Sequence, residues 1–343
     1  MPKISVIIPC YNVAPYIDRC LASVLAQTIG MDNLEVICVD DASEDNTWER
    51  LRMWERLYPN NILLIRQETN RRQGTARNIG VAYASADWIA FIDADDWVEP
   101  DYFELLYHYA MECHCDMVCC GFERDYSSTL VYLDEKSRDN GEDLYIFPYE
   151  KIIRKELIIS DVIAGVWGIL LRKSLILDQD IFFPEDVAYE DMYFQALVCV
   201  YTGGVYVVGK KLYHYFVNTA STVLRRNSDH HMDWLTVWMR LWEECGKRGL
   251  LDLYREELEY CCMKNAVGFV QLLILRYSVP SFSLFRLTSQ ILRERVPEYR
   301  ENPYIERFTD IYPMVLEKLY EEPFNRSDFE LLVGYVKTQW EIE

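Results

Sequence analysis

Basic residues are few in this sequence, and long apolar stretches are missing. Lys and Arg number 35 against 55 Asp and Glu, so the formal net charge at pH 7 is −20. Such an acidic chain repels a phosphate backbone, and we expect no nucleic-acid partner. The nearest candidate for a membrane span, residues 266–275, contains Gln271 and is shorter than the roughly 18 residues that a span needs. We therefore expect at most peripheral contact with a membrane.

Several catalytic and nucleotide-binding motifs are also missing. A dinucleotide-binding GxGxxG would follow the first strand, where this sequence has Pro-Cys-Tyr-Asn at residues 9–12. A P-loop needs GxxxxGKS or GxxxxGKT, and Gly74 and Gly80 bracket no such lysine. Neither a GxSxG elbow nor an HExxH helix is present. These absences exclude Rossmann dehydrogenases, P-loop nucleotidases, α/β-hydrolases and HExxH metalloproteases.

A secretion signal and paired cysteines are not apparent either. The chain opens Met-Pro-Lys and enters a five-residue apolar strand, which does not resemble a signal peptide. The 11 cysteines are odd in number and scattered, so we expect reduced thiols and a cytoplasmic location. Because no CxxC pair recurs at zinc-finger spacing, burial in a helix end and a strand is favoured over a zinc site for the densest group. That group is Cys113, His114, Cys115, Cys119 and Cys120.

The first 123 residues alternate between strand and helix patterns with short connections. Residues 4–8 form a continuous apolar run, which is typical of a strand buried on both faces. Residues 15–27 carry one apolar stripe, which is typical of a helix. The alternation predicts an α/β fold with a mostly parallel sheet between helices. The other predicted strands are 36–39, 62–65, 88–92, 117–121, 166–171, 205–208 and 213–216, and the other predicted helices are 48–57, 74–84, one after Pro100, and 190–201.

The pattern changes twice along the rest of the chain. Residues 124–150 are polar and turn-rich, which indicates an excursion from the core. After about Asp229 the patterns are long and helical, without a convincing strand. We therefore divide the chain into an α/β domain, residues 1–228, and a C-terminal helical domain, residues 229–343.

Acidic residues follow two strands of the predicted sheet. Asp40 and Asp41 end one strand, and Asp93 to Asp96 follow another. In an open α/β sheet, ligands bind beyond the carboxyl ends of the strands. Carboxylates gathered there repel each other unless a cation or a hydrogen-bond donor lies among them. Since Mg²⁺ and Mn²⁺ take oxygen ligands and bridge to phosphates, the pattern fits a metal-bound nucleoside diphosphate.

Three segments together carry a family resemblance. They are SVIIPCYNVAPYIDRCLASVLAQT, VICVDDASEDNT and NRRQGTARNIGVAYASADWIAFIDADDWVEPDYF. In this order and spacing they resemble a family 2 glycosyltransferase, whose GT-A fold has a mostly parallel, Rossmann-like sheet. The resemblance is close over about the first 120 residues. It resumes at Tyr189-Glu190-Asp191 and extends more loosely to residues 213–215.

By position, the resemblance implies a nucleotide-sugar donor site, usually for a UDP-sugar. Asp41 matches the acid that accepts the uracil N3 hydrogen, and Asp93 matches the acid on the ribose side. Arg77 matches a basic residue near the base or the diphosphate. The residues implied to bind the donor are Pro9, Tyr11, Asn12, Asp40, Asp41, Arg77, Asp93, Ala94 and Glu190.

The resemblance also implies a metal and a catalytic base. Asp95, in the DxD motif at residues 93–95, would bind Mn²⁺ or Mg²⁺ between the two phosphates. Asp191, in an ED motif with Glu190, would take the proton of the attacking acceptor hydroxyl, so that the sugar is transferred with inversion. The alternative for Glu190 and Asp191 is a pair of first-turn acids that favour the helix dipole. His214 would supplement the metal or diphosphate site, or be a hydrogen-bonded core histidine.

Two features narrow the implied activity. Processive synthases of this family carry QxxRW and transmembrane helices, whereas Gln271 leads only into Leu-Leu-Ile-Leu-Arg-Tyr. We therefore expect a non-processive enzyme that adds single sugars to a glycan or lipid-linked acceptor. The resemblance implies cell-surface polysaccharide synthesis at the cytoplasmic face of a bacterial membrane.

A polar loop follows the last predicted strand. Its residues Ser221, Arg225 and Arg226 form either a basic flap over the diphosphate or a solvated turn.

Two other functions stay open at this point. A nucleotidyltransferase would need a glycine-rich loop with Lys or Arg after the first strand, where Tyr11 and Asn12 stand. A catalytically silent sugar-nucleotide-binding or scaffold protein is the other alternative, although the key acids are all present. The helices after residue 229 carry apolar stripes that fit packing, docking on a lipid-linked acceptor, or a homo-oligomer.

Overall fold

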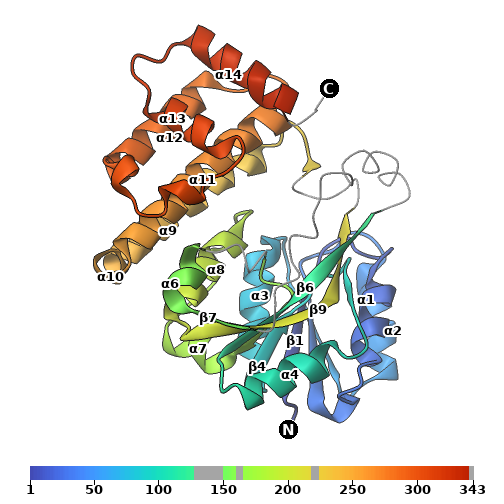
Figure 1. Ribbon diagram of the computed structural model, residues 1–343. Helices are drawn as coiled ribbons and strands as arrows, with labels where there is room; N and C mark the ends of the chain where they lie inside the picture. Colours follow the sequence, from blue (N-terminus) through green and yellow to red (C-terminus); the bar gives the residue numbers. More distant parts are fainter. Residues whose placement is uncertain (127–149, 160–164, 218–223, 340–343) are drawn as a thin grey trace. The chain divides into compact units, whose positions relative to one another are not determined.

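The computed structural model describes residues 1–126, 150–159, 165–217 and 224–339. They fall into two compact units, Met1–Thr219 and Ala220–Glu343 (Figure 1). The domain division that we expect from the sequence, 1–228 and 229–343, stays a prediction. Most of the predicted excursion at 124–150 lies outside the described residues, and its first three residues belong to a strand of the sheet.

A parallel half-sheet makes up the first part of unit Met1–Thr219. The strands β1 (Ile4–Cys10), β2 (Leu34–Asp40), β3 (Ile62–Arg66) and β4 (Trp88–Phe91) lie in the order β3-β2-β1-β4 and pair in parallel. Six of the seven residues of β1 are buried, which explains its continuous apolar run. The carboxyl ends of these four strands therefore meet at one edge of the sheet.

The second half of the sheet is mixed. β8 (Ile169–Arg172) runs antiparallel to β4 and to β6 (Met117–Tyr126). β5 (Trp97–Val98) and β7 (Glu150–Ile153) run antiparallel to β9 (Gly204–Val217), and β6 runs parallel to it. The two short strands predicted at 205–208 and 213–216 are one strand, β9. The polar break between them is an irregularity opposite Gly121, where the register shifts, and not a turn.

Helices cover both faces of this sheet, because side chains alternate along each strand. In β1, Ile4, Val6 and Ile8 join a core cluster with residues of α1 (Ile17–Leu25). Ile7 points the other way and lies against Gly80 of α3 (Arg72–Tyr83). The remaining helices of the unit are α2 (Thr47–Leu57), α4 (Tyr102–Glu112), α6 (Arg154–Ile159), α7 (Lys173–Asp178) and α8 (Glu190–Tyr201). Figure 1 shows α1 and α2 together on one side of the sheet.

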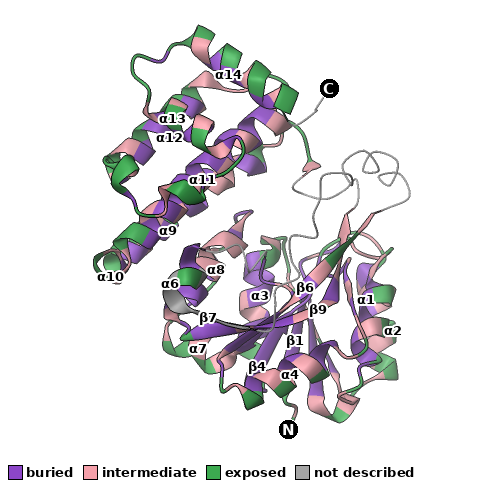
Figure 2. Ribbon diagram, in the orientation of Figure 1, coloured by how far each residue is buried: buried purple, intermediate pink, exposed green. Residues whose placement is uncertain are grey.

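Among the described residues of the unit Ala220–Glu343, the regular elements are all helices. Its longest helix, α11 (Arg255–Arg276), buries apolar side chains all along its length (Figure 2). α11 contacts each of the other long helices of the unit. These helices are α9 (Asp233–Lys247), α12 (Phe282–Arg295), α13 (Tyr312–Tyr320) and α14 (Arg326–Gln339); the short α10 (Leu250–Leu253) precedes α11.

One expectation about membrane spans needs correction. By length and composition alone, α11 is apolar enough to cross a membrane, with a mean hydropathy of 1.3 over its best 18 residues. The sequence does not show α11 as an uninterrupted apolar run, because Lys264 and Gln271 lie among its apolar residues. Since 61% of that window is buried inside the protein, α11 has the burial of a core helix.

Candidate active site

The acids predicted at the sheet edge lie at the ends of the expected strands. Asp40 ends β2, Asp41 follows it, and Asp93 comes two residues after the end of β4. The backbone N–H of Asp41 donates to the carbonyl of Cys10 at the end of β1, with 2.8 Å between N and O. The ends of β1, β2 and β4 thus meet, as the spacing of the motifs predicts.

Asp41 is buried and held by the segment that follows β3. Its Oδ1 accepts hydrogen bonds from the Gln67 side chain at 2.7 Å and from the Arg71 backbone N–H at 2.8 Å. Burial raises the pKa of Asp41, while the backbone hydrogen bonds lower it in part. Its neighbour Asp40 is fully buried, and its Oδ2 lies 3.1 Å from the Arg66 guanidinium. Asp40 is therefore engaged with a cation inside the protein, and the ligand contact that the resemblance implies for Asp41 stays a prediction.

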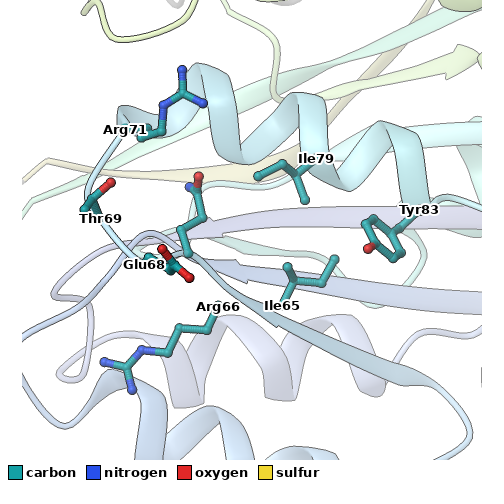
Figure 3. Close-up of a pocket in the computed structure, with 8 residues that line it drawn as sticks. Ile65, Arg66, Glu68, Thr69, Arg71, Ile79 and Tyr83 are labelled. Atoms are coloured by element: carbon teal, nitrogen blue, oxygen red, sulfur yellow. The ribbon is translucent and has the colours of Figure 1, made fainter.

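A cavity of about 450 Å³ lies beside these partners of Asp41. Figure 3 shows Arg66, Thr69 and Arg71 at one end of it and Tyr83 at the other. Its walls come from β3, the following loop and α3, and none of the residues that we predict for the site lines it. The cavity adjoins the site through Arg66, which pairs with Asp40, and through Gln67 and Arg71, which donate to Asp41.

The segment after β1 is fastened to the segment after β2. The side-chain oxygen of Asn12 accepts from the backbone N–H groups of Glu44 at 2.9 Å and Asp45 at 3.3 Å. Asn12 has a φ of 52°, in the left-handed region that asparagine tolerates. Its neighbour Tyr11 is exposed, whereas Pro9 is part of β1 and pairs with Val39. Tyr11 is thus free to meet a ligand, and Asn12 shapes the turn that presents it.

Arg77 lies inside the protein between two acids. Its guanidinium is 2% exposed, with Nη1 at 2.5 Å from Glu190 Oε1 and Nη2 at 2.7 Å from Asp93 Oδ1. Burial would lower the pKa of Arg77, but the charges of Asp93 and Glu190 outweigh burial and raise it. The side chain joins two acids within the protein, so its predicted contact with the base or diphosphate stays a prediction that this geometry does not favour.

Glu190 and Asp191 form the first turn of α8. Glu190 is fully buried, and burial raises its pKa to about 7 although the charge of Arg77 lowers it. Asp191 is half-buried, and its Oδ1 accepts from the backbone N–H of Met192 at 3.0 Å. Burial also raises the pKa of Asp191, with Arg77 lowering it and Asp93 raising it. Asp191 is thus a partly exposed carboxylate with a raised pKa, and such a group is suited to proton transfer.

In the DxD segment, the buried Asp96 differs in role from the partly exposed Asp93 and Asp95. Asp96 is buried and accepts from the Tyr213 hydroxyl at 2.6 Å and from the Phe216 backbone at 2.7 Å. Ala94 is buried and Asp95 is half-buried. The Arg19 guanidinium donates to the backbone oxygen of Asp95 at 2.7 Å, a contact that the sequence pattern does not reveal. Asp96 therefore anchors this segment to β9 and leaves Asp93 and Asp95 at the edge.

His214 is enclosed by other side chains. Its Nδ1 lies 2.8 Å from Asp125 Oδ2, its Nε2 lies 2.9 Å from Glu99 Oε1, and its ring stacks on Trp97 with centroids 4.8 Å apart. A metal ligand needs a free ring nitrogen, and both nitrogens are engaged by carboxylates. The metal role of His214 stays a prediction, and the geometry favours the hydrogen-bonded alternative.

A divalent cation fits this edge through oxygen donors. Among the described residues, no group of three His, Cys, Asp or Glu side chains is spaced to hold a metal ion. Mg²⁺ and Mn²⁺ commonly bind through one or two carboxylates together with substrate phosphates. Asp93 and Asp95 are the partly exposed oxygen donors that suit such a shared site. Ser221 lies outside the described residues, and Arg225, whose carbonyl accepts from His231, belongs to the helical unit.

Residues 5–178, more than half of the chain, match the family described as glycosyl transferase family 2. A putative glycosyltransferase, EpsH, from Bacillus subtilis is 31% identical over 261 residues, which cover 75% of this chain and 73% of EpsH.

Two solved structures have a similar fold. One is Staphylococcus aureus TarS, residues 1–349, in complex with UDP-GlcNAc. It is 18% identical, with a TM-score of 0.56, and the likeness covers 98% of this chain and 88% of that one. The other is the mannosyltransferase PcManGT from Pyrobaculum calidifontis in complex with GDP-Man and Mn²⁺. It is 17% identical, with a TM-score of 0.52, and the likeness covers 100% and 88%. The predicted GT-A fold is confirmed, and the chain belongs to glycosyltransferase family 2.

Proposed function

We propose that this glycosyltransferase moves a single sugar from a UDP-sugar to a hydroxyl of a glycan or lipid-linked acceptor, with inversion. The observation that carries the proposal is the convergence of Asp41, Asp93 and Asp191 at one sheet edge. Arg77 ties the segment of Asp93 to that of Asp191 through Glu190. The three acids would serve the nucleobase, the ribose-diphosphate and the attacking hydroxyl.

The donor would lie across the ends of β1, β2 and β4. Tyr11 is an exposed ring that can stack on the base, and Asp41 is an acceptor for its N–H. UDP-GlcNAc bound to the TarS neighbour supports a uridine nucleotide here. The donor sugar itself is left to experiment.

Asp191 is the proposed general base. A base acts best when its pKa lies near the working pH, and burial moves the pKa of Asp191 in that direction. The leaving diphosphate departs as an anion, so one protein carboxylate suffices, in contrast to the two that glycoside hydrolases use.

Asp95, with Asp93 beside it, would hold the cation that the proposal requires. Bound Mn²⁺ or Mg²⁺ would supply positive charge to the departing diphosphate. Mn²⁺ in the PcManGT neighbour supports this choice of metal. His214 is the less favoured second ligand, because it would first have to leave Glu99 or Asp125.

We further propose that the enzyme works without processivity in cell-surface polysaccharide synthesis, at the cytoplasmic face of the membrane. Contact with the membrane would be peripheral, and a second copy of the chain is a candidate partner. These points rest on the family resemblance. A catalytically silent, donor-binding protein is the alternative that the next experiment separates.

Thermal unfolding against a panel of nucleoside-diphosphate sugars, first with Mn²⁺ and then with EDTA, tests the donor site. A ligand at about 100 times its dissociation constant stabilises the fold by roughly 2.7 kcal/mol. We expect a shift with one UDP-sugar that EDTA reduces, and that Asp95→Ala reduces in the presence of Mn²⁺. An equal shift with and without chelator would reject the metal, and a shift without any sugar transfer would favour the silent protein.

A further inference from the structure

We infer that Arg77 is a positioning residue, which acts on the reaction through Glu190 and Asp93 and not by contact with the donor. This inference rests on the proposed function, because it assigns Arg77 a task in the same site. It replaces the donor contact that the family resemblance implies for this position.

The guanidinium of Arg77 is enclosed by an aromatic ring and two acids. Arg77 is 2% exposed, and Phe183 lies under it with 5.5 Å between the guanidinium carbon and the ring centroid. Nη1 and Nη2 point to acids from two different segments, at 2.5 Å and 2.7 Å. A planar guanidinium has a rigid fork that can hold two carboxylates at once. A side chain so occupied has no reach toward a diphosphate.

The two acids that Arg77 holds belong to the two halves of the reaction. Asp93 opens the DxD segment, which we assign to the donor, and Glu190 precedes Asp191, which we assign to the acceptor hydroxyl. Without Arg77, Glu190 would be a buried charge without a cation, which is costly. Arg77 therefore sets the distance between the donor segment and the base.

The helix that carries Arg77 is docked on the segment that leads to Glu190. Asn78 exchanges two hydrogen bonds with the backbone of Phe183, each 2.9 Å long. Arg71 is paired with Glu185 at 2.6 Å and with Asp186 at 3.0 Å. A Cβ at Gly74 would lie 2.7 Å from the Pro184 carbonyl oxygen. One face of α3 thus holds residues 183–190 at several points, and Arg77 extends this hold to Asp93.

Electrostatics point the same way. The charged groups that act most strongly on Asp191 and Glu190 include Arg77 from α3, Asp93 from the segment after β4, and the two acids of α8 on each other. Only Arg77 is positive among them, and its charge lowers the pKa of both Glu190 and Asp191 against the effect of burial. The charge of Arg77 therefore also favours the ionised form of the proposed base, against the effect of burial.

The test compares Arg77→Met and Arg77→Lys with a control at the opposite edge of the sheet. Arg172 is also paired with an acid, Asp116, at 2.7 Å, and it lies over Trp88, the first residue of β4. We expect Arg77→Met to lower kcat about 100-fold, because small misplacements of reacting groups cost that much. The dissociation constant of UDP in EDTA should change less than about twofold, since no donor contact is lost. Arg172→Met should leave both quantities unchanged.

Two further measurements separate positioning from a general loss of structure. The acid limb of the pH profile of kcat should move to higher pH in Arg77→Met and stay in place in Arg77→Lys, which retains the charge. Arg77→Met combined with Glu190→Gln should lose no more activity than the worse single variant, since both act through one contact. If Arg77→Met fails to fold, the positioning role is tested with Arg77→Lys instead. For that variant we expect a loss of about tenfold in kcat.

The outcomes also distinguish this inference from the proposed function. If the unaltered enzyme transfers no sugar from any nucleotide sugar, the proposed function fails. If it does transfer, a large rise in the UDP dissociation constant of the Arg77 variants with kcat unchanged would overturn the inference, because Arg77 would then be a donor ligand. Additive losses in the Arg77 and Glu190 variants would overturn it as well.

Discussion

The acids at the sheet edge share one chemistry and differ in their partners. Asp96 is buried and accepts two hydrogen bonds from β9, so it stabilises the segment that carries it. Glu190 is buried against Arg77, whereas Asp191 and Asp95 keep part of their surface. Burial and partners therefore decide which of these acids can meet a substrate.

The variant Asp191→Asn should still bind the donor but lose most of its sugar-transfer activity. The amide has nearly the same shape as the carboxylate and cannot take a proton, and general-base catalysis contributes about 10²–10⁴ in rate. We expect kcat to fall by that factor while the UDP-sugar-induced shift in unfolding temperature persists. Initial rates of sugar transfer, measured beside Glu190→Gln, check this. Undiminished transfer by Asp191→Asn would remove Asp191 as the base.

The pH dependence follows from the direction of the pKa shifts. Burial raises the pKa of Asp191, so its carboxyl stays protonated to a higher pH than an ordinary aspartate and is inactive as a base below that pH. We expect kcat to rise with pH through this raised value, and Asp191→Asn to lack that limb.

The free energy of unfolding should change with pH in the opposite direction to kcat. The pKa of Glu190 is raised to about 7 in the folded state, so the unfolded chain loses this proton first as pH rises. The contribution of Glu190 to the free energy of unfolding should therefore decline between the ordinary glutamate value of roughly 4.3 and about pH 7. Chemical denaturation of the native chain and of Glu190→Gln across this range measures the difference.

Among the helices, α3 connects the two halves of the site. Gly74, Arg77 and Asn78 lie against residues 183–190, and Gly80 lies against β1. The sequence predicts a helix over 74–84 and the structure has α3 at Arg72–Tyr83, so the element was found from its local pattern. The contacts of α3 with residues 183–190 could not be found in this way, because those residues are remote in the chain and only the tertiary fold brings them to the helix.

Two glycines of α3 offer a matched pair of substitutions. In Gly74→Ala the new Cβ would lie 2.7 Å from Pro184 O and 2.9 Å from Glu190 Cγ. In Gly80→Ala it would lie 2.3 Å from Ile7 Cγ2. Overpacking of this kind costs about 1–3 kcal/mol, partly offset by the helix preference of alanine.

We expect both glycine variants to lower the free energy of unfolding. Only Gly74→Ala should also lower kcat, because it displaces the segment of Glu190 and Asp191. Denaturant unfolding and initial rates measure the two effects. A loss of kcat in Gly80→Ala as large as that in Gly74→Ala would contradict a specific role of the first turn of α3.

The chain as a whole consists of two units that each bury their own apolar core. Units of this size commonly unfold as separate cooperative steps. We expect calorimetry to resolve two transitions, of which a bound UDP-sugar raises only that of unit Met1–Thr219, which contains all the residues that we predict for the site. A single transition that shifts with the donor would show that the units unfold together.

Local patterns in the sequence were sufficient for the architecture and for the order of the acidic motifs. Parallel strands with crossover helices bring their carboxyl ends to one edge, so Asp41 and Asp93 could be assigned to that edge without coordinates. The long strand β9 was read as two, because the irregularity opposite Gly121 breaks the apolar pattern without ending the strand.

The partner of each polar side chain was decided by the folded structure. Arg77 reads as a donor ligand in the sequence and is enclosed by Asp93 and Glu190, and His214 reads as a metal ligand and is held by Glu99 and Asp125. In each case the residue and its partners are far apart in the chain. A sequence motif specifies which groups are present at an edge, whereas burial and distance determine whether they face a ligand or one another.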